Sequence, residues 1–354
     1  MSVFKDLKVV ELASVLAGPA VGMFFAELGA NVIKIENKKT NGDVTRNWKS
    51  SNEKTENTSA YFSCVNWGKK HLFIDYTNDN DFTKLLSLCK EADVIICNFK
   101  YGDAQKFNLS YLDLKKNNEK VIYAQLNGFK SQPKRVAFDV VLQAECGYMH
   151  MNGQKDSPPT KMPLAIMDLL AAHQLKEGVL VALLKKEQTG KGSLVETSLE
   201  ETALSSLANQ ATNWLMNHEI PQRIGSMHPN IAPYGDVFTT KDNKLLVTAI
   251  GSDKQFASFW NLLGSKEIAT EDKFSSNQNR LKNRIELQET LGALILHCNR
   301  DELIEQCIQR GIPVGAIKNM EEVFSSKTAQ NMLLEEVVNG EKTTRIKSVA
   351  FKIS

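Results

Sequence analysis

The sequence is poor in cysteine and has little excess charge of either sign. It carries six cysteines in 354 residues, and no two of them have the CxxC spacing. We therefore expect free thiols in a reducing compartment and no cysteine-based metal site. The 43 basic and 41 acidic residues leave a net charge of +2. This balance gives no reason to expect nucleic acid or an acidic membrane surface as a partner.

Long apolar runs are also absent. No stretch approaches the run of about 20 apolar residues that a membrane span needs. The N-terminal segment Met1–Lys5 is not a basic region followed by a long apolar one, so no signal peptide is expected. These absences predict a cytoplasmic protein without a membrane partner.

The common catalytic and cofactor motifs are missing as well. The chain has no GxxxxGK[ST], GxSxG or HExxH string, which argues against a Walker nucleotide site, a hydrolase elbow and a zinc site. In the turn Gly18–Gly22, Pro19 stands where the GxGxxG pattern brings the backbone close to a pyrophosphate. Lysine pairs at 38–39, 69–70 and 185–186 fit either solvated surface or local docking of a polyphosphate. We expect no metal and no tightly bound cofactor.

Strand-like and helix-like segments alternate through the first 200 residues. Short apolar runs are typical of buried parallel strands, and the segments between them have helical spacing. This rhythm predicts an open parallel sheet covered by helices. The expected strands are 7–12, 32–35, 72–74, 93–97, 121–126 and 194–197, and the expected helices are 20–28, 82–89, 112–117, 169–188 and 199–215.

The pattern changes near residue 225. Two strand-like runs, 236–239 and 245–250, flank the turn Lys241–Asn243, which predicts an antiparallel pair. Amphipathic helices are expected at about 256–263, 284–297 and 301–309. This part of the chain is interpreted as a smaller α+β domain.

Several specific strings occur in order along nearly the whole chain. They are LGANVIKIE (28–36), GDVTR (42–46), NWGKK (66–70), ADVIICNF (92–99), FDVVLQA (138–144), QTGKG (188–192) and HP…PY (228–234). Together with the Gly18-Pro19 turn and Asp168, these strings resemble the family III CoA-transferases. That group includes the formyl-CoA and carnitine CoA-transferases and the α-methylacyl-CoA racemases.

The resemblance implies an α/β fold with two domains. A large domain with a Rossmann-like open parallel sheet would comprise residues 1–199 and 326–354, and a smaller α+β domain residues 200–325. The resemblance also implies an interlocked homodimer. Its substrates would be an acyl-CoA and a carboxylic acid, so coenzyme A would be part of a substrate rather than a bound cofactor.

Asp168 matches the nucleophile of that family. A carboxylate nucleophile attacks the thioester, and an aspartyl-CoA thioester then carries the CoA to the second acid. Asp168 lies where the long helix is expected to begin, and the positive end of a helix favours an ionised carboxylate. The alternative is purely structural, because aspartate before an apolar helical run is a common N-cap.

The resemblance places the CoA contacts mostly just after the ends of expected strands. Open parallel sheets bind ligands at that edge. Lys38, Lys100 and Lys106 are the expected phosphate partners, and Arg135 stands next to Val136, where formyl-specific members carry a basic residue. The full set of expected contacts is Val15, Leu16, Ala17, Asn37, Lys38, Ile74, Asp75, Asn98, Phe99, Lys100, Lys106, Arg135, Ala137 and Asp139.

Two other functions fit the same resemblance. Racemases of the family carry a histidine at the position of Phe138, and a phenyl ring cannot move a proton. The position therefore favours transfer over racemisation. A CoA-binding homologue without activity is the other alternative, although Asp168 is retained. Leu16 replaces a glutamine of formyl-CoA transferases, so formate and oxalate are not the preferred substrates.

Overall fold

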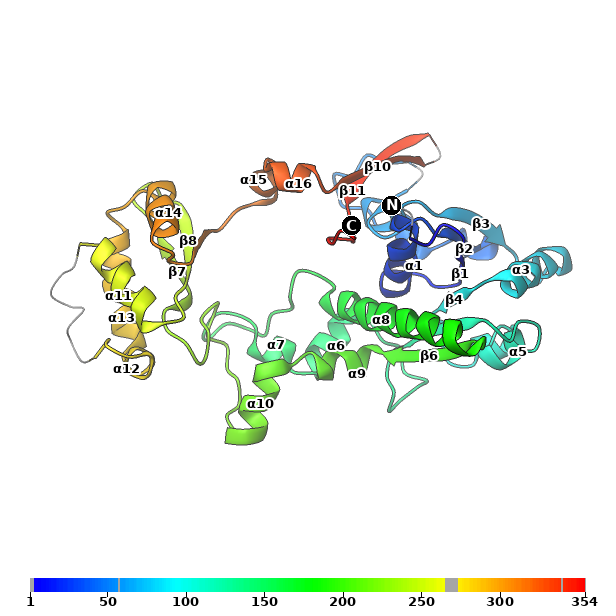
Figure 1. The fold of residues 1–354 in the computed structure, drawn as a ribbon, viewed down its shortest axis with the longest axis horizontal. Helices are drawn as coiled ribbons and strands as arrows, with labels where there is room; N and C mark the ends of the chain where they lie inside the picture. Colours follow the sequence, from blue (N-terminus) through cyan, green and yellow to red (C-terminus); the bar gives the residue numbers. More distant parts are fainter. Residues whose placement is uncertain (1–2, 57, 265–272, 339, 354) are drawn as a thin grey trace. The chain divides into compact units, whose positions relative to one another are not determined.

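The computed structural model describes residues 3–56, 58–264, 273–338 and 340–353. It divides into two compact units (Figure 1). Unit 1 comprises Met1–His150, Lys161–Pro221 and Thr328–Ser354, and unit 2 comprises Met151–Thr160 and Gln222–Lys327. The chain passes from unit 1 to unit 2 after Pro221 and returns to unit 1 after Lys327. The domain boundaries expected from the sequence stay a prediction.

A six-stranded sheet forms the centre of unit 1. Its order is β3-β2-β1-β4-β5-β6 and every neighbouring pair is parallel. The predicted α/β class and open parallel sheet are confirmed, and all six expected strands are present. The strands are β1 (Lys8–Glu11), β2 (Asn31–Asn37), β3 (Lys70–Ile74), β4 (Val94–Cys97), β5 (Ile122–Asn127) and β6 (Ser193–Ser198).

Helices cover both faces of this sheet because its central strands are apolar on both sides. On one face, α1 (Ala17–Glu27) and α8 (Ile166–Thr189) share a core with alternate strand residues such as Val94 and Ile96. On the other face, α3 (Asp79–Glu91) and α5 (Tyr111–Lys115) pack against Ile95 and its neighbours. Alternation along one strand therefore supplies two separate cores.

The expected helix 199–215 is wrong in one respect, because the chain forms two helices there. They are α9 (Leu199–Ser205) and α10 (Ala208–Asn217), and Ala208, the first residue of α10, has a positive φ of 47°. A residue in this backbone region interrupts the regular helical hydrogen bonds. Apolar spacing continued across the break, so the sequence pattern did not reveal it.

Unit 2 contains a three-stranded sheet in the order β7-β8-β9. The predicted antiparallel pair is confirmed by β7 (Tyr234–Thr239) and β8 (Leu245–Ala249), and β9 (Val314–Ala316) was too short to predict. Its core surrounds the fully buried Trp260. The helices of this unit include α11 (Asp253–Leu262), α12 (Asn277–Lys282), α13 (Arg284–Ile295), α14 (Arg300–Gln309) and α15 (Met320–Phe324).

A C-terminal hairpin that was not predicted completes unit 1. Its strands are β10 (Leu333–Val338) and β11 (Glu341–Ile346), and Arg345 donates a hydrogen bond of 2.8 Å to the carbonyl oxygen of Ser63. The remaining short helices are η1 (Lys38–Thr40), η2 (Val44–Asn47), α2 (Ala60–Ser63), α4 (Asp103–Lys106), α6 (Asp139–Glu145), α7 (Tyr148–Met151) and α16 (Lys327–Gln330).

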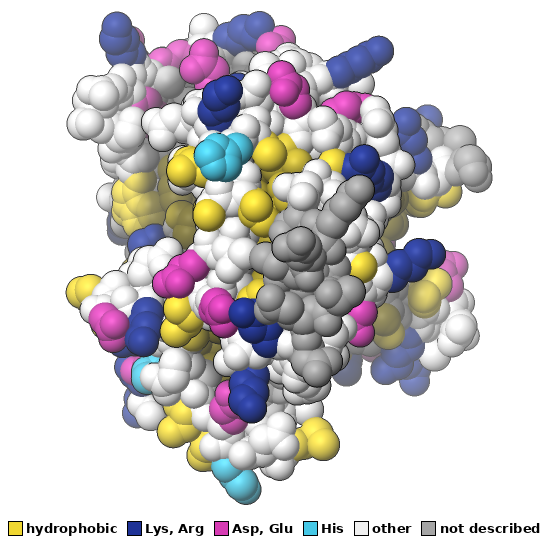
Figure 2. Space-filling model, turned by 90° about the vertical axis from the view of Figure 1, so that its left-hand side faces the viewer, with side chains coloured by type: hydrophobic (Ala, Val, Ile, Leu, Met, Phe, Trp, Pro, Cys, Tyr) yellow, Lys and Arg dark blue, Asp and Glu magenta, His cyan; other side chains and the backbone are white. Residues whose placement is uncertain are grey.

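The surface and the helices agree with the bulk composition. Among the described residues, no helix combines the length and the apolar character that crossing a membrane would require. All six cysteines are free thiols. On the face drawn in Figure 2, basic and acidic side chains are interspersed, as the small net charge implies.

Candidate active site

The strand order of unit 1 reverses between β1 and β4. The connections from these two strands run to opposite sides, and such a switch point is where open α/β sheets bind ligands. Ser14 follows β1 and Asn98 follows β4. The Asn98 side chain accepts a hydrogen bond from the Ser14 N–H (3.0 Å) and donates one to the Ser14 carbonyl oxygen (2.8 Å). One side chain thus joins both sides of the switch point.

Several expected CoA contacts lie at this same edge of the sheet. Asn37 ends β2, Ile74 ends β3, and Asn98 directly follows β4. Because all these strands are parallel, their carboxyl ends share one edge. Asp75, next to Ile74, is already occupied, because its carboxylate accepts hydrogen bonds from the backbone and hydroxyl of Thr77. Its backbone N–H, which could otherwise donate to an anion, donates a hydrogen bond of 2.9 Å to Asp81 Oδ2.

The basic residues of the expected site differ in their surroundings. Lys38, Lys100 and Lys106 are exposed, as phosphate partners need to be. Arg135 instead forms a two-pronged ion pair with Glu145, and its guanidinium lies 4.3 Å from the centre of the Phe129 ring. Arg135 also lines an open surface pocket. That pocket is formed by Tyr101, Gln132, Pro133, Lys134 and Arg135.

Two glycines let the loop after β1 approach the sheet closely. A Cβ on Gly18 would collide with the Ala13 side chain, and a Cβ on Gly22 would collide with the Glu11 carboxylate. The Gly18-to-Gly22 spacing therefore places one turn of α1 directly over the end of β1. This packing positions the expected contacts Val15, Leu16 and Ala17, of which the last two are buried.

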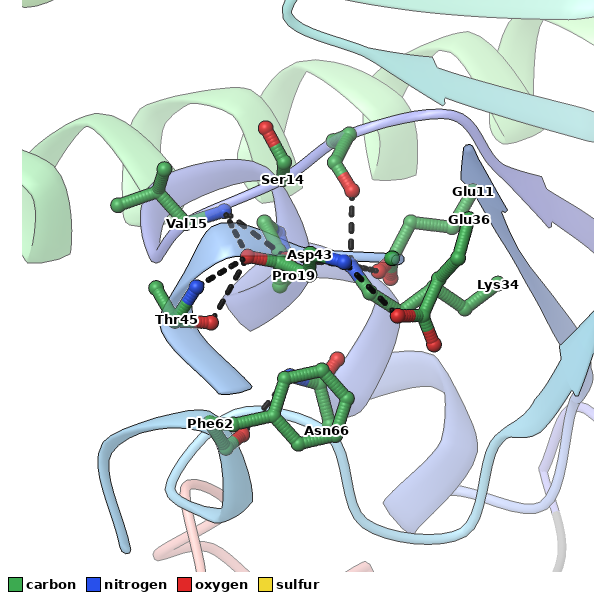
Figure 3. A network of polar contacts seen from close by, with 12 residues as sticks. Glu11, Ser14, Val15, Pro19, Lys34, Glu36, Asp43, Thr45, Phe62 and Asn66 are labelled. Atoms are coloured by element: carbon green, nitrogen blue, oxygen red, sulfur yellow. Dashed lines mark hydrogen bonds and ion pairs between the residues drawn. The ribbon is translucent and has the colours of Figure 1, made fainter. Parts of the chain in front are cut away.

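A buried network of charges lies beneath that loop (Figure 3). Lys34 contacts Glu11 and Asp43, each at 3.0 Å, and Lys69 contacts Glu11 at 2.7 Å. All four side chains are at most 1% exposed. Burial disfavours the charged form of Lys34, but Glu11 and Asp43 outweigh this and raise its pKa. The interpretation of the 69–70 lysine pair as solvated surface or a polyphosphate site is therefore wrong for Lys69.

The N-terminus of α8 carries Asp168. The interpretation of Asp168 as the N-cap is wrong, because Ala165 occupies the cap position and Asp168 is the third helical residue. The capping group is instead Asp139, whose Oδ1 accepts a hydrogen bond of 2.7 Å from the Met167 N–H. Asp139 was expected as a CoA contact. In this structure its carboxylate holds the helix that bears Asp168.

Gln143 extends this support to the segment before α8. Its side-chain amide donates hydrogen bonds to Asp139 Oδ2 (2.6 Å) and to the carbonyl oxygen of Leu164 (3.3 Å). Its Oε1 accepts a hydrogen bond of 2.7 Å from the Met162 N–H. Gln143 is completely buried, so the loop leading to Asp168 is fixed from α6.

The electrostatic setting of Asp168 differs from the expectation that the helix N-terminus would favour its ionised form. Burial, and to a smaller extent the nearby Asp139 carboxylate, raise the pKa of Asp168 from 3.8 to about 7. A helix N-terminus contributes at most about 2 kcal/mol to an anion in its first turn. Desolvation and repulsion therefore outweigh it. A carboxylate held at this pKa is a more basic, and hence stronger, nucleophile than an exposed one.

Tyr61 belongs to the same site and was not predicted. It packs in one apolar cluster with Leu16, Ala165 and Leu169, and its ring lies 5.2 Å from that of Trp48. Burial, followed by the charge of Asp168, raises the pKa of Tyr61 to about 12, so it is a neutral hydroxyl beside the carboxylate. No sequence signal marks it, because α2 is only four residues long.

Comparison with known proteins gives one consistent result. The family model of CoA-transferase family III matches residues 4–354. A succinate–glutarate CoA-transferase of Agrobacterium fabrum is 32% identical over 97% of this chain and 87% of that protein. A succinyl-CoA:mesaconate CoA-transferase of Haloarcula hispanica is 30% identical over 92% of this chain and 82% of that protein. The crystal structure of a CAIB/BAIF family protein from Brucella suis has a TM-score of 0.84 at 33% identity, covering 98% of this chain and 92% of that one.

Proposed function

The chain belongs to CoA-transferase family III and transfers CoA between acyl-CoA thioesters and carboxylic acids; we propose that Asp168 carries the CoA covalently during transfer. The observation that supports this most is the setting of Asp168. It is a carboxylate with a raised pKa in the first turn of α8, and its neighbour Leu169 lies in one apolar cluster with Val15 and Leu16.

The proposed reaction has four balanced steps. The Asp168 carboxylate attacks the thioester carbon and releases the CoA thiolate, which leaves a mixed anhydride on the enzyme. The thiolate then attacks the aspartyl carbon and releases the first acid, which leaves an aspartyl-CoA thioester. The second acid attacks that thioester and frees the thiolate again, and the thiolate takes the new acyl group and releases the Asp168 carboxylate.

The same proposal assigns the CoA moiety to the carboxyl edge of the parallel sheet. Lys38, Lys100 and Lys106 supply exposed cations for its phosphates. Arg135 lines the open surface pocket and is a further proposed contact, for which a CoA phosphate would have to replace its ion-pair partner Glu145. For the acids, the names of the relatives suggest dicarboxylates. They include succinate–glutarate and succinyl-CoA:mesaconate CoA-transferases.

We also propose that the protein is a homodimer. Large apolar side chains are exposed on unit 1, and such surfaces mark association sites in many proteins. Exposed fractions reach 71% for Leu215 and 75% for Met216 on α10, and 66% for Leu184 on α8. Burying these side chains against a second copy would remove their contact with water.

Trapping the covalent adduct tests the catalytic proposal. The protein is mixed with succinyl-CoA without an acceptor acid, and the tryptic peptide Met162–Lys176 is examined by mass spectrometry. We expect an adduct that hydroxylamine releases and that borohydride reduces to an alcohol. Asp168→Asn should still fold and bind CoA but form no adduct and transfer no CoA to glutarate. Normal turnover by Asp168→Asn would overturn the proposal.

A further inference from the structure

We infer that Asp43 is a positioning residue, which holds Val15 in a strained backbone conformation and thereby aligns the loop Val15–Ala17 with the helix that bears Asp168. The inference rests on the proposed function, because the alignment matters for catalysis only if Asp168 carries the CoA. Its structural basis is the buried network of Figure 3.

Val15 has an unusual backbone. Its φ is +72°, in the left-handed region that β-branched residues rarely occupy. Such conformations persist only where the surrounding structure enforces them, and they cluster at functional sites. Val15 directly precedes Leu16, the residue before α1, so its conformation sets the direction in which the chain enters the helix.

Asp43 supplies the enforcing contact. Its carboxylate accepts a hydrogen bond from the Val15 N–H at 3.1 Å. The same two oxygens also receive the N–H and hydroxyl of Thr45, at 3.0 and 2.8 Å, and the ammonium of Lys34 at 3.0 Å. Among the residues that the structure describes, each of these hydrogen bonds and ion pairs brings a donor to the carboxylate. An asparagine at position 43 would point its own N–H groups at one of these donors. The Asp43→Asn substitution keeps the shape of the side chain but must therefore break at least one of these hydrogen bonds or the ion pair.

Polar side chains also hold the backbone of the residues on either side of Val15. Lys34 donates to the Ala13 carbonyl oxygen (2.8 Å), Asn98 bonds both backbone groups of Ser14, and Lys69 donates to the Pro19 carbonyl oxygen (2.8 Å). Side-chain hydrogen bonds thus hold the backbone before, at and after Val15. The side of the loop that carries Leu16 packs with Leu169, one residue beyond Asp168.

A comparison of glycine and alanine at position 15 tests this inference. Val15→Gly and Val15→Ala both remove the valine methyl groups, but only glycine adopts a positive φ without strain. With Asp43 present, Val15→Gly should therefore melt at a higher temperature than Val15→Ala. This comparison needs no change at Asp43, so it remains informative if Asp43→Asn does not fold. Equal melting temperatures would overturn the inference.

The catalytic part is tested by combining the changes. Asp43→Asn should lower kcat, measured per folded protein with succinyl-CoA and glutarate, by about tenfold or more, because misplacing reacting groups is costly. Adding Val15→Gly to Asp43→Asn should raise kcat again by about threefold or more. The reason is that glycine adopts the positive φ without strain and therefore depends less on the Asp43 hydrogen bond. Adding Val15→Ala should not raise kcat.

The outcomes separate this inference from the proposed function. A wild-type protein that transfers CoA, together with an Asp43→Asn variant of unchanged kcat, would overturn the positioning role and leave Asp168 chemistry intact. Equal effects of glycine and alanine in the Asp43→Asn background would also overturn it. Absence of transfer by the wild-type protein would contradict the proposed function, while the melting comparison would still decide the strain at Val15.

Discussion

Replacing Asp168 by asparagine should make the folded protein more stable, and increasingly so as the pH rises. The reason is the cost of an ionised carboxylate in the setting of Asp168. Burial and the Asp139 carboxylate raise its pKa to about 7, so the folded state binds the Asp168 proton more tightly than the unfolded chain does. Asparagine keeps the shape of the side chain and carries no charge.

The sign and size follow from proton linkage. Between the ordinary pKa of 3.8 and the folded value of about 7, the unfolded chain releases the Asp168 proton first. The folded wild-type protein therefore loses stability as the pH rises through this window and loses no more above it. Because each tenfold change in proton affinity corresponds to about 1.4 kcal/mol, the full effect is at most about 4 kcal/mol. Between pH 5 and pH 8 the expected change is about 2–3 kcal/mol.

Urea unfolding at pH 5 and pH 8 measures this effect. The free energy of unfolding of Asp168→Asn, minus that of the wild-type protein, should be larger at pH 8 by about 2–3 kcal/mol. Glu177→Gln is the matched control, since Glu177 is an exposed carboxylate of the same helix, and its difference should not grow in this way. A difference for Asp168→Asn that is constant, or that shrinks toward pH 8, would refute the argument.

Two further predictions concern coenzyme A and the second copy of the chain. Alanine at Lys38, Lys100 or Lys106 should weaken CoA binding in calorimetry, by about tenfold or more for a residue that contacts a phosphate, whereas Lys185→Ala should not; unchanged affinity in all three would remove the proposed phosphate site. Sedimentation at micromolar concentration should show a dimer, which Leu215→Glu should weaken, and a wild-type monomer would contradict the proposal.

Much of the parallel sheet could be predicted because its strands depend on local pattern. The run Val94–Cys97 is apolar at every position, and a strand buried on both faces has that composition. The hairpin at 333–346 lacks such a signal. Its strands carry charged residues at many positions, including Glu335, Glu336 and Arg345, and they are paired by contacts that no local pattern reports.

The site was predictable only in part, for a similar reason. The positions at the ends of β2, β3 and β4 follow from the parallel topology. Lys34 and Glu11, however, look like surface charges in the sequence and are fully buried in an ion pair. The cap of α8 comes from Asp139, which accepts a hydrogen bond from the N–H of Met167, 28 positions later in the sequence. Such contacts depend on how helices pack, and periodicity contains no information about them.

The surroundings of Phe138 favour transfer over racemisation. Racemisation requires two acid/base groups on opposite faces of the substrate carbon. Phe138 is the N-cap residue of α6 and has no proton to move. The adjacent carboxylate, Asp139, accepts one hydrogen bond from the Met167 N–H and another from Gln143, so both of its oxygens serve the structure. The segment that would supply a second base therefore supports the helix that carries Asp168, and a single carboxylate with a raised pKa is what covalent CoA transfer requires.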